Sequence, residues 1–132
     1  MRLSERELQN REQWESRGYR LPAFDRAAAA EKTKAEPRWI HFGGGNTFRA
    51  LQAHAVQKML DCGAADTGLI MAGGPEIVEK ISRPCDNYSV LVTLRADGST
   101  EKTVIGSVVE TLVLDAGRDD FRRLREMTAL FH

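Results

Sequence analysis

Three consecutive glycines, Gly43–Gly45, stand between a short apolar run and a segment with helical periodicity. The apolar run, residues 39–42, predicts a buried strand. Residues 47–61 predict a helix, because their apolar side chains recur at roughly a 3.6-residue period. Glycine loses more conformational freedom on folding than any other residue, so three in a row indicate a turn that side chains must not crowd. A strand, a tight turn and a helix in this order are typical of the βαβ units of α/β proteins.

A second unit of the same kind follows. Residues 68–72 predict another buried strand, which ends at Gly73 and Gly74, and Pro75 suits the first turn of a short helix over residues 76–81. Gly63 lies between the two units, where we expect it to cap the first helix at its C-terminus. Alternating strands and helices of this kind predict a parallel sheet.

The next part of the chain is rich in valine and threonine and predicts antiparallel strands. Asp97-Gly98 is a strong hairpin turn signal between residues 88–95 and 100–107, and residues 108–114 predict a further strand. Residues 118–130 predict a helix with an apolar side chain at every third position. The predicted fold class is therefore α/β, with a partial Rossmann-type parallel sheet, an antiparallel hairpin and flanking helices.

The N-terminal part predicts helices that cannot form a core alone. Residues 3–18 predict a polar helix, with Ser4 as N-cap and Glu7 three residues later, the spacing of a capping box. A connector with a helical tendency around its alanines follows between Pro22 and Pro37. We therefore expect an N-terminal helical arm and connector over residues 1–36, and the first part of an α/β domain over residues 37–132.

Composition and charge argue against several classes of function. The chain of 132 residues has a formal net charge of zero, which argues against a nucleic-acid binder. No apolar run approaches the roughly 18 residues of a membrane span, and the N-terminus is too polar for a signal peptide. Cys62 and Cys85 lack metal or redox spacing and fit a reducing compartment. We expect a cytoplasmic protein with no metal site and no membrane or nucleic-acid partner.

The glycine turn has the chemistry of a phosphate site. A helix N-terminus offers unpaired backbone N–H groups and the positive end of the helix dipole, and a pyrophosphate can approach only where side chains are absent. Gly43 and Gly45 match the first two glycines of G-x-G-x-x-G/A, whereas Phe48 replaces the third, so helix–strand packing must be built differently there. We expect residues 37–132 to bind a dinucleotide. The alternatives are the adenosyl group of a methyltransferase cofactor, or a tight turn without a ligand.

The sequence settles neither the choice between NAD and NADP nor any catalytic group. The second predicted strand ends without the carboxylate that usually holds the adenosine ribose. Glu76 is the nearest carboxylate, and a favourable charge in the first turn of its own helix is its simpler role. His41 in the predicted buried strand, His54 in the helix and His132 at the end show no catalytic spacing. We expect structural or solvent-facing roles for these histidines, and no catalytic residue in the chain.

The segment Phe42–Ala50, FGGGNTFRA, resembles the cofactor turn G-x-G-N-x-x-R-A of the polyol-specific long-chain dehydrogenases. This is the family of mannitol dehydrogenase, fructuronate reductase and tagaturonate reductase. Three further stretches are similar to family sequences: AFDR at 23–26, DNYSVLV at 86–92 and VIGSVVE at 104–110. The resemblance covers residues 22–130 of the chain, and the glycine turn is its most specific part.

The resemblance implies the N-terminal cofactor-binding portion of an NAD(P)-dependent oxidoreductase, which interconverts a sugar alcohol or an aldonate and its keto form. NAD is the expected cofactor, with NADP not excluded. Thr47 and Phe48 stand where the family carries other residues, often Phe followed by His or Leu. The residues implied at the cofactor are Gly43, Gly44, Gly45, Asn46, Thr47, Phe48 and Arg49.

The family's catalytic lysine, asparagine and histidine lie in a second, helical domain, in the pattern K-x-x-x-x-N-x-x-x-H, which does not occur here. We therefore expect that domain to be absent and the chain alone to be inactive, with the sugar substrate binding only to a full-length protein. A half-sheet leaves an unpaired edge, so we also expect self-association or marginal stability. The alternative is a stand-alone nucleotide-binding or interaction module without catalysis.

Overall fold

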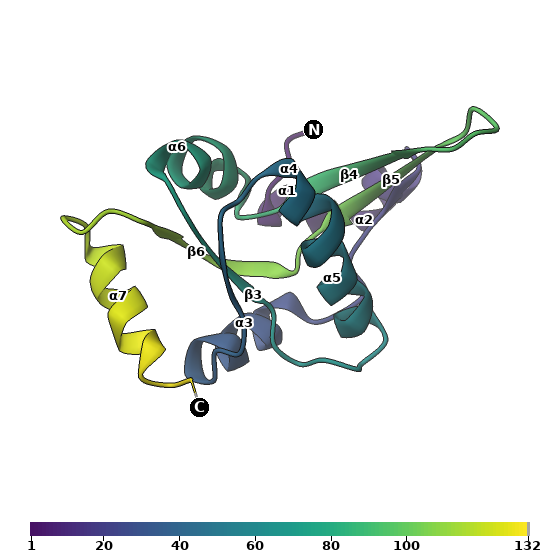
Figure 1. The fold of residues 1–132 in the computed structure, drawn as a ribbon. Coiled ribbons are helices and arrows are strands. Elements are labelled where there is room, and N and C mark those ends of the chain that lie inside the picture. Colours follow the sequence, from purple (N-terminus) through teal and green to yellow (C-terminus); the bar gives the residue numbers. More distant parts are fainter. Residues whose placement is uncertain (132) are drawn as a thin grey trace.

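A computed structural model describes residues 1–131, and its strands form two three-stranded sheets (Figure 1). The first sheet is entirely parallel, with the strand order β2-β3-β6. The central strand β3 is buried along its whole length, as expected for a parallel strand with an uninterrupted apolar sequence. The strands of this sheet are β2 (Ile40–Phe42), β3 (Leu69–Gly73) and β6 (Val108–Val113).

The second sheet contains the predicted hairpin and has the strand order β1-β5-β4. Strands β4 and β5 pair antiparallel along their whole length, and the hairpin projects from the body of the molecule (Figure 1). Gly98 has the positive φ of 84° that its place in the turn requires. The strands of this sheet are β1 (Tyr19–Arg20), β4 (Ser89–Leu94) and β5 (Thr100–Ile105).

Helices cover both faces of the parallel sheet, and the predicted α/β class is confirmed. Leu69 and Met71 pack with the helix that follows β2, whereas Ile70 and Ala72 pack with α7. This division follows from the alternation of side chains along a strand. No helix within residues 1–131 is long and apolar enough to cross a membrane. The helices are α1 (Glu5–Leu8), α2 (Arg11–Glu15), α3 (Arg26–Ala35), α4 (Asn46–Phe48), α5 (His54–Asp61), α6 (Pro75–Ile77) and α7 (Asp119–Thr128).

Two segments of wider, π-helical geometry, which the sequence did not predict, continue these helices. Segment η1 (Arg49–Ala53) joins α4 to α5, so the helix after the glycine turn is continuous over residues 46–61. Segment η2 (Val78–Ser82) continues α6 and is followed by the 3-10 turn η3 (Arg83–Cys85). Each π segment thus follows a glycine turn at the end of a parallel strand.

The single helix predicted over residues 3–18 is wrong, because the chain forms α1 and α2 with a break at Asn10. The Asn10 side chain accepts a hydrogen bond from the backbone N–H of Gln13 and so begins a new helix. Asparagine competes with the helical backbone in this way and favours caps. The predicted cap at the start is confirmed, since Ser4 Oγ accepts the N–H of Glu7 at 3.3 Å.

The N-terminal segment also adds strand β1 to the second sheet, which the sequence did not predict. Strand β1 pairs parallel with β5, and below it a buried cluster joins the arm to the hairpin. Arg26 connects the same parts, because its guanidinium donates to Gly106 O, Val108 O and Asp86 O. The domain boundary near Pro37 stays a prediction. The buried cluster contains Leu8, Trp14, Leu21, Tyr88 and Val104.

Candidate functional site

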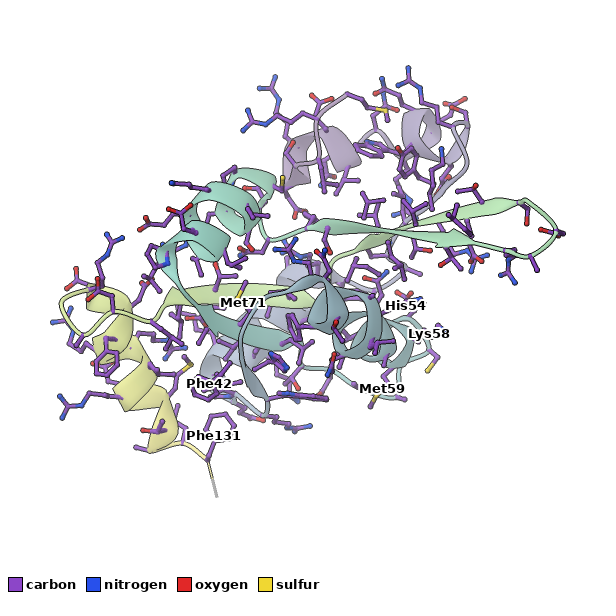
Figure 2. All side chains as sticks on the ribbon, turned by 45° about the horizontal axis from the view of Figure 1, so that its top comes forward. Phe42, His54, Lys58, Met59, Met71 and Phe131 are labelled. Atoms are coloured by element: carbon purple, nitrogen blue, oxygen red, sulfur yellow. The ribbon has the colours of Figure 1, made fainter. Side chains whose placement is uncertain are left out.

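The three glycines at the end of β2 meet different physical requirements. Gly43 has a φ of 108°, a region that other residues rarely adopt. At Gly44 a Cβ atom would lie 2.6 Å from Ile77 Cγ2 of α6 and 2.8 Å from Met71 Sδ of β3, so any side chain there would displace Ile77 and Met71. Figure 2 labels Met71. At Gly45 the φ is −69° and nothing lies within 4 Å of a built Cβ. Folding therefore explains the first two glycines and leaves the third without a structural reason.

The open position at Gly45 lies at the start of the helix over residues 46–61. Gly45 is the N-cap, and its carbonyl accepts the N–H of Arg49 at 3.2 Å, which is the first hydrogen bond of the helix. No side chain caps this end, so the N–H groups of residues 46–48 are free of intrahelical partners. Asn46 and Thr47 are exposed. This arrangement provides a set of backbone donors and the positive end of a helix dipole with space for an anion.

Phe48 and His41 give the turn a support that sequence reasoning missed. The Phe48 ring is buried, with 4% of its surface exposed, and it stacks on the His41 imidazole with the ring centroids 4.1 Å apart. His41 Nδ1 lies 2.9 Å from Gly43 O. His41 is half-buried, so its expected place inside a buried strand was wrong: β2 is the edge strand of its sheet. Only the backbone of Phe48 can reach a ligand, and its ring provides the different helix–strand packing that the missing third glycine requires.

Arg49 is half-buried beside the turn and has no carboxylate partner among residues 1–131. It borders a cavity of about 310 Å³ whose lining combines polar and apolar side chains. Tyr88 contributes to the cavity wall, and burial together with its hydrogen bond to Glu5 raises the pKa of its hydroxyl above the ordinary value. The cavity is lined by Asn46, Arg49, Ala50, Ile81, Tyr88 and Leu91, among others.

A second glycine turn stands beside the first, at the end of β3. Gly74 is the N-cap of α6 with a φ of −64°, and no atom lies within 4 Å of a built Cβ, the same situation as at Gly45. Glu76 is exposed in the first turn of this helix and forms an ion pair with Lys80 at 2.7 Å. This pairing agrees with a role for Glu76 within its own helix. The carboxyl ends of two adjacent parallel strands therefore both present open helix starts.

Within residues 1–131, the remaining candidate residues share no hydrogen bond or ion pair with one another. His54 lies beside Lys58 on α5 (Figure 2), and burial together with the Lys58 charge lowers its pKa. Cys62 and Cys85 are both free thiols. Within residues 1–131 no group of histidine, cysteine and acidic side chains has the geometry of a metal site. His132 lies outside the described residues.

Sequence comparison identifies a protein that is similar to this chain. The chain is 40% identical to D-mannonate oxidoreductase of Thermotoga maritima over 129 residues, which are 96% of this chain and 24% of the relative. The chain resembles a sugar-acid oxidoreductase over nearly its whole length. The resemblance expected from the glycine turn is thereby confirmed. The chain spans about a quarter of the length of this relative, and no family model matches it.

Two solved structures share the fold. D-sorbitol dehydrogenase in its substrate-free form superposes with a TM-score of 0.67 at 22% identity, over 86% of this chain and 22% of that protein. Mannitol 2-dehydrogenase of Pseudomonas fluorescens, in a ternary complex with NAD and D-mannitol, superposes with a TM-score of 0.66 at 23% identity and the same coverage. The Rossmann-type arrangement of the described residues is thus one that polyol dehydrogenases also have.

Proposed function

We propose that this chain is the NAD-binding portion of an oxidoreductase that interconverts a sugar alcohol or an aldonate with its keto form. The observation that carries the proposal is Gly45, an open position at an uncapped helix start with an unpaired arginine one turn away. An added Cβ would fill the space that a pyrophosphate needs. The residues proposed to hold the cofactor are Gly43, Gly44, Gly45, Asn46, Thr47, Phe48 and Arg49.

These residues would bind the cofactor without taking part in the chemistry. The backbone N–H groups of residues 46–48 would donate to the pyrophosphate, and the Arg49 guanidinium would neutralise its charge. Bound NAD supplies the nicotinamide that accepts or returns a hydride. His41, the histidine beside this turn, contacts Gly43 O and the Phe48 ring, so other residues of the natural protein would have to orient the sugar and move its hydroxyl proton. By itself the chain is proposed to be inactive.

The proposed cofactor is NAD, and the proposed substrate class includes sugar acids. The solved mannitol 2-dehydrogenase holds NAD, which favours NAD over NADP for a chain of the same fold. The identity of 40% to D-mannonate oxidoreductase makes D-mannonate the first substrate to test. A cytoplasmic location remains a proposal, which the nicotinamide cofactor supports.

The test is a titration of the natural protein that contains these residues with NADH, followed by its fluorescence. We expect saturable binding, weaker binding of NADPH, and no competition by an adenosylated methyl donor. NAD-dependent oxidation of D-mannonate, D-mannitol and D-sorbitol then identifies the substrate. Absence of saturable NADH binding would refute the proposal, and preference for the methyl donor would favour a methyltransferase.

Self-association of the isolated chain is a separate proposal. No strand within residues 1–131 pairs with the outer edge of β2, and Trp39 and Phe42 beside this edge are 44% and 62% exposed. An unpaired edge with apolar side chains is a template for another strand. Sedimentation of the chain over a range of concentrations should show association, and a strictly monomeric chain would contradict the expectation.

A further inference from the structure

The end of β5 and its connection to β6 make three buried polar contacts with the helix that follows the glycine turn. Ser107 Oγ donates to Ala53 O at 2.6 Å. Gln57 Nε2 donates to Val104 O at 2.7 Å, and Gln57 Oε1 accepts the N–H of Gly106 at 2.6 Å. Ser107 is fully buried, and Gln57 is 2% exposed. These residues include the VIGS stretch at 104–107, for which the family resemblance implied no role.

Ala53 is the last residue of the π-helical segment η1. A π turn holds one residue more than an α turn and disturbs the regular pairing of backbone carbonyls. The Ser107 hydroxyl supplies a donor to the Ala53 carbonyl, and this fully buried hydrogen bond lies at the end of the wider turn. Segment η1 lies directly between the glycine turn and α5, so the contact acts on the link between them.

The wider turn sets the direction in which the cofactor residues point. Helix α5 is fixed against the core through Val56 and Leu60, and through Gln57. Since successive residues of an α-helix are rotated by about 100°, one residue more in the intervening turn rotates Asn46 and Arg49 by about that angle relative to α5. In the observed geometry both residues line the same cavity, at the first turn of the helix that Gly45 begins.

We propose that Ser107, assisted by Gln57, is a positioning residue for cofactor binding. It holds η1 in the π-helical form, and thereby aims Arg49 and the free N–H groups of residues 46–48 at the same space. The inference rests on the proposed function for its ligand. The three hydrogen bonds of Ser107 and Gln57, called the clamp below, join residues of this chain and involve no ligand.

The test compares Ser107→Ala with Thr33→Val in the natural protein that contains these residues. Thr33 serves as the control because it is also fully buried, its Oγ1 donates to a helix carbonyl, Ala29 O, at the same 2.6 Å, and it lies on α3 rather than on the helix of the glycine turn. Its Oγ1 also accepts the N–H of Gly68 at 2.8 Å, so Thr33→Val removes at least as many buried hydrogen bonds as Ser107→Ala. Both variants should melt at a lower temperature. Only Ser107→Ala should raise the Kd for NADH, by about tenfold, with a larger effect on KM for NAD than on kcat.

Two results would overturn the inference. One is a Kd of Ser107→Ala within about twofold of the unsubstituted protein; the other is an equal rise in Kd for both variants, which would indicate general destabilisation. If Ser107→Ala does not fold, Ser107→Cys keeps the size of the side chain with a weaker donor and should give a smaller rise of Kd in the same direction.

Hydrogen exchange separates a failure of this inference from a failure of the proposed function. Backbone amides of residues 49–57 should exchange faster in Ser107→Ala and keep their rate in Thr33→Val, whether or not NADH binds. If the unsubstituted protein does not bind NADH, the proposed function fails. The rates of hydrogen exchange in the two variants still test whether Ser107 stabilises segment η1. Unchanged exchange in Ser107→Ala would refute the clamp.

Discussion

Substitution of Gly45 is expected to separate cofactor binding from folding. Its φ of −69° and ψ of 175° are accessible to any residue, and a Cβ there meets no atom within 4 Å. Gly45→Ala removes freedom from the unfolded chain, which stabilises by about 0.4–1 kcal/mol. Alanine is a poorer N-cap than glycine, by about 0.5 kcal/mol or more. The two effects offset each other, so the free energy of unfolding should change by less than about 0.5 kcal/mol.

The neighbouring glycine provides the contrast. Gly44→Ala would place its Cβ 2.6 Å from Ile77 Cγ2, and overpacking of this kind costs about 1–3 kcal/mol. The two substitutions add the same methyl group at adjacent positions of one turn. The predicted loss of stability is therefore confined to Gly44→Ala, for a reason unrelated to any ligand.

The assay pairs urea unfolding with NADH fluorescence titration in the natural protein that contains this turn. Gly45→Ala should weaken NADH binding by about tenfold or more, which corresponds to about 1.4 kcal/mol, and Gly45→Val should weaken it further. Unchanged affinity in Gly45→Val would refute the assignment of the turn to a pyrophosphate. A marked loss of stability in Gly45→Ala would instead refute the argument that folding leaves this position open.

Three further outcomes are expected. Arg49→Met should weaken NADH binding by about tenfold or more, because a charge-assisted hydrogen bond contributes about 1.5–3 kcal/mol, while thermal melting shows no loss of stability. Burial tends to raise the pKa of Asp120, but hydrogen bonds from Val113 N–H and Arg83 outweigh it and hold the pKa below the ordinary 3.8. The stabilisation from Asp120 is therefore complete above that pH and is lost as the pH falls through the lower folded-state pKa. In Asp120→Asn the free energy of unfolding, measured as a function of pH, should fall less steeply on the acid side. Met127→Ala, at a fully buried position of α7, should cost about 2–5 kcal/mol in urea unfolding.

The parts of the fold that the sequence predicted correctly are those indicated by residues close together in the chain. The glycine turn, the Asp97-Gly98 hairpin and the Ser4 cap each depend on residues within a few positions of one another, where backbone preference decides the conformation. The buried strand β3 was predictable because every residue in it is apolar or glycine. The second helix of the N-terminal segment was missed although Asn10 is a favoured N-cap, since the apolar pattern there is too sparse to reveal the break.

Contacts between distant segments account for what was not predicted. Strand β1 has only two residues, and it exists because the backbone of Tyr19–Arg20 pairs with β5 some 80 positions later. The π segment η1 is stabilised by the Ser107 hydroxyl, 54 positions from its acceptor. The His41–Phe48 stack spans a turn whose path depends on three glycines. None of these contacts has a signature within a window of neighbouring residues, so periodicity and propensity cannot indicate them.

The environments of the half-buried arginines give the strongest physical argument for an anion at the glycine turn. Within residues 1–131 only Arg26, Arg49 and Arg123 are half-buried. Arg26 pairs with Glu5 and Arg123 with Glu110, and each also donates to a backbone carbonyl. Arg49 has neither kind of partner among the same residues, and its side-chain nitrogen atoms are not among the buried unpaired atoms, so they remain accessible to an anion. The chain has equal numbers of acidic and basic side chains, 19 of each, so a shortage of carboxylates does not explain the exception. A bound phosphate group would compensate Arg49 as the carboxylates do for the other two arginines.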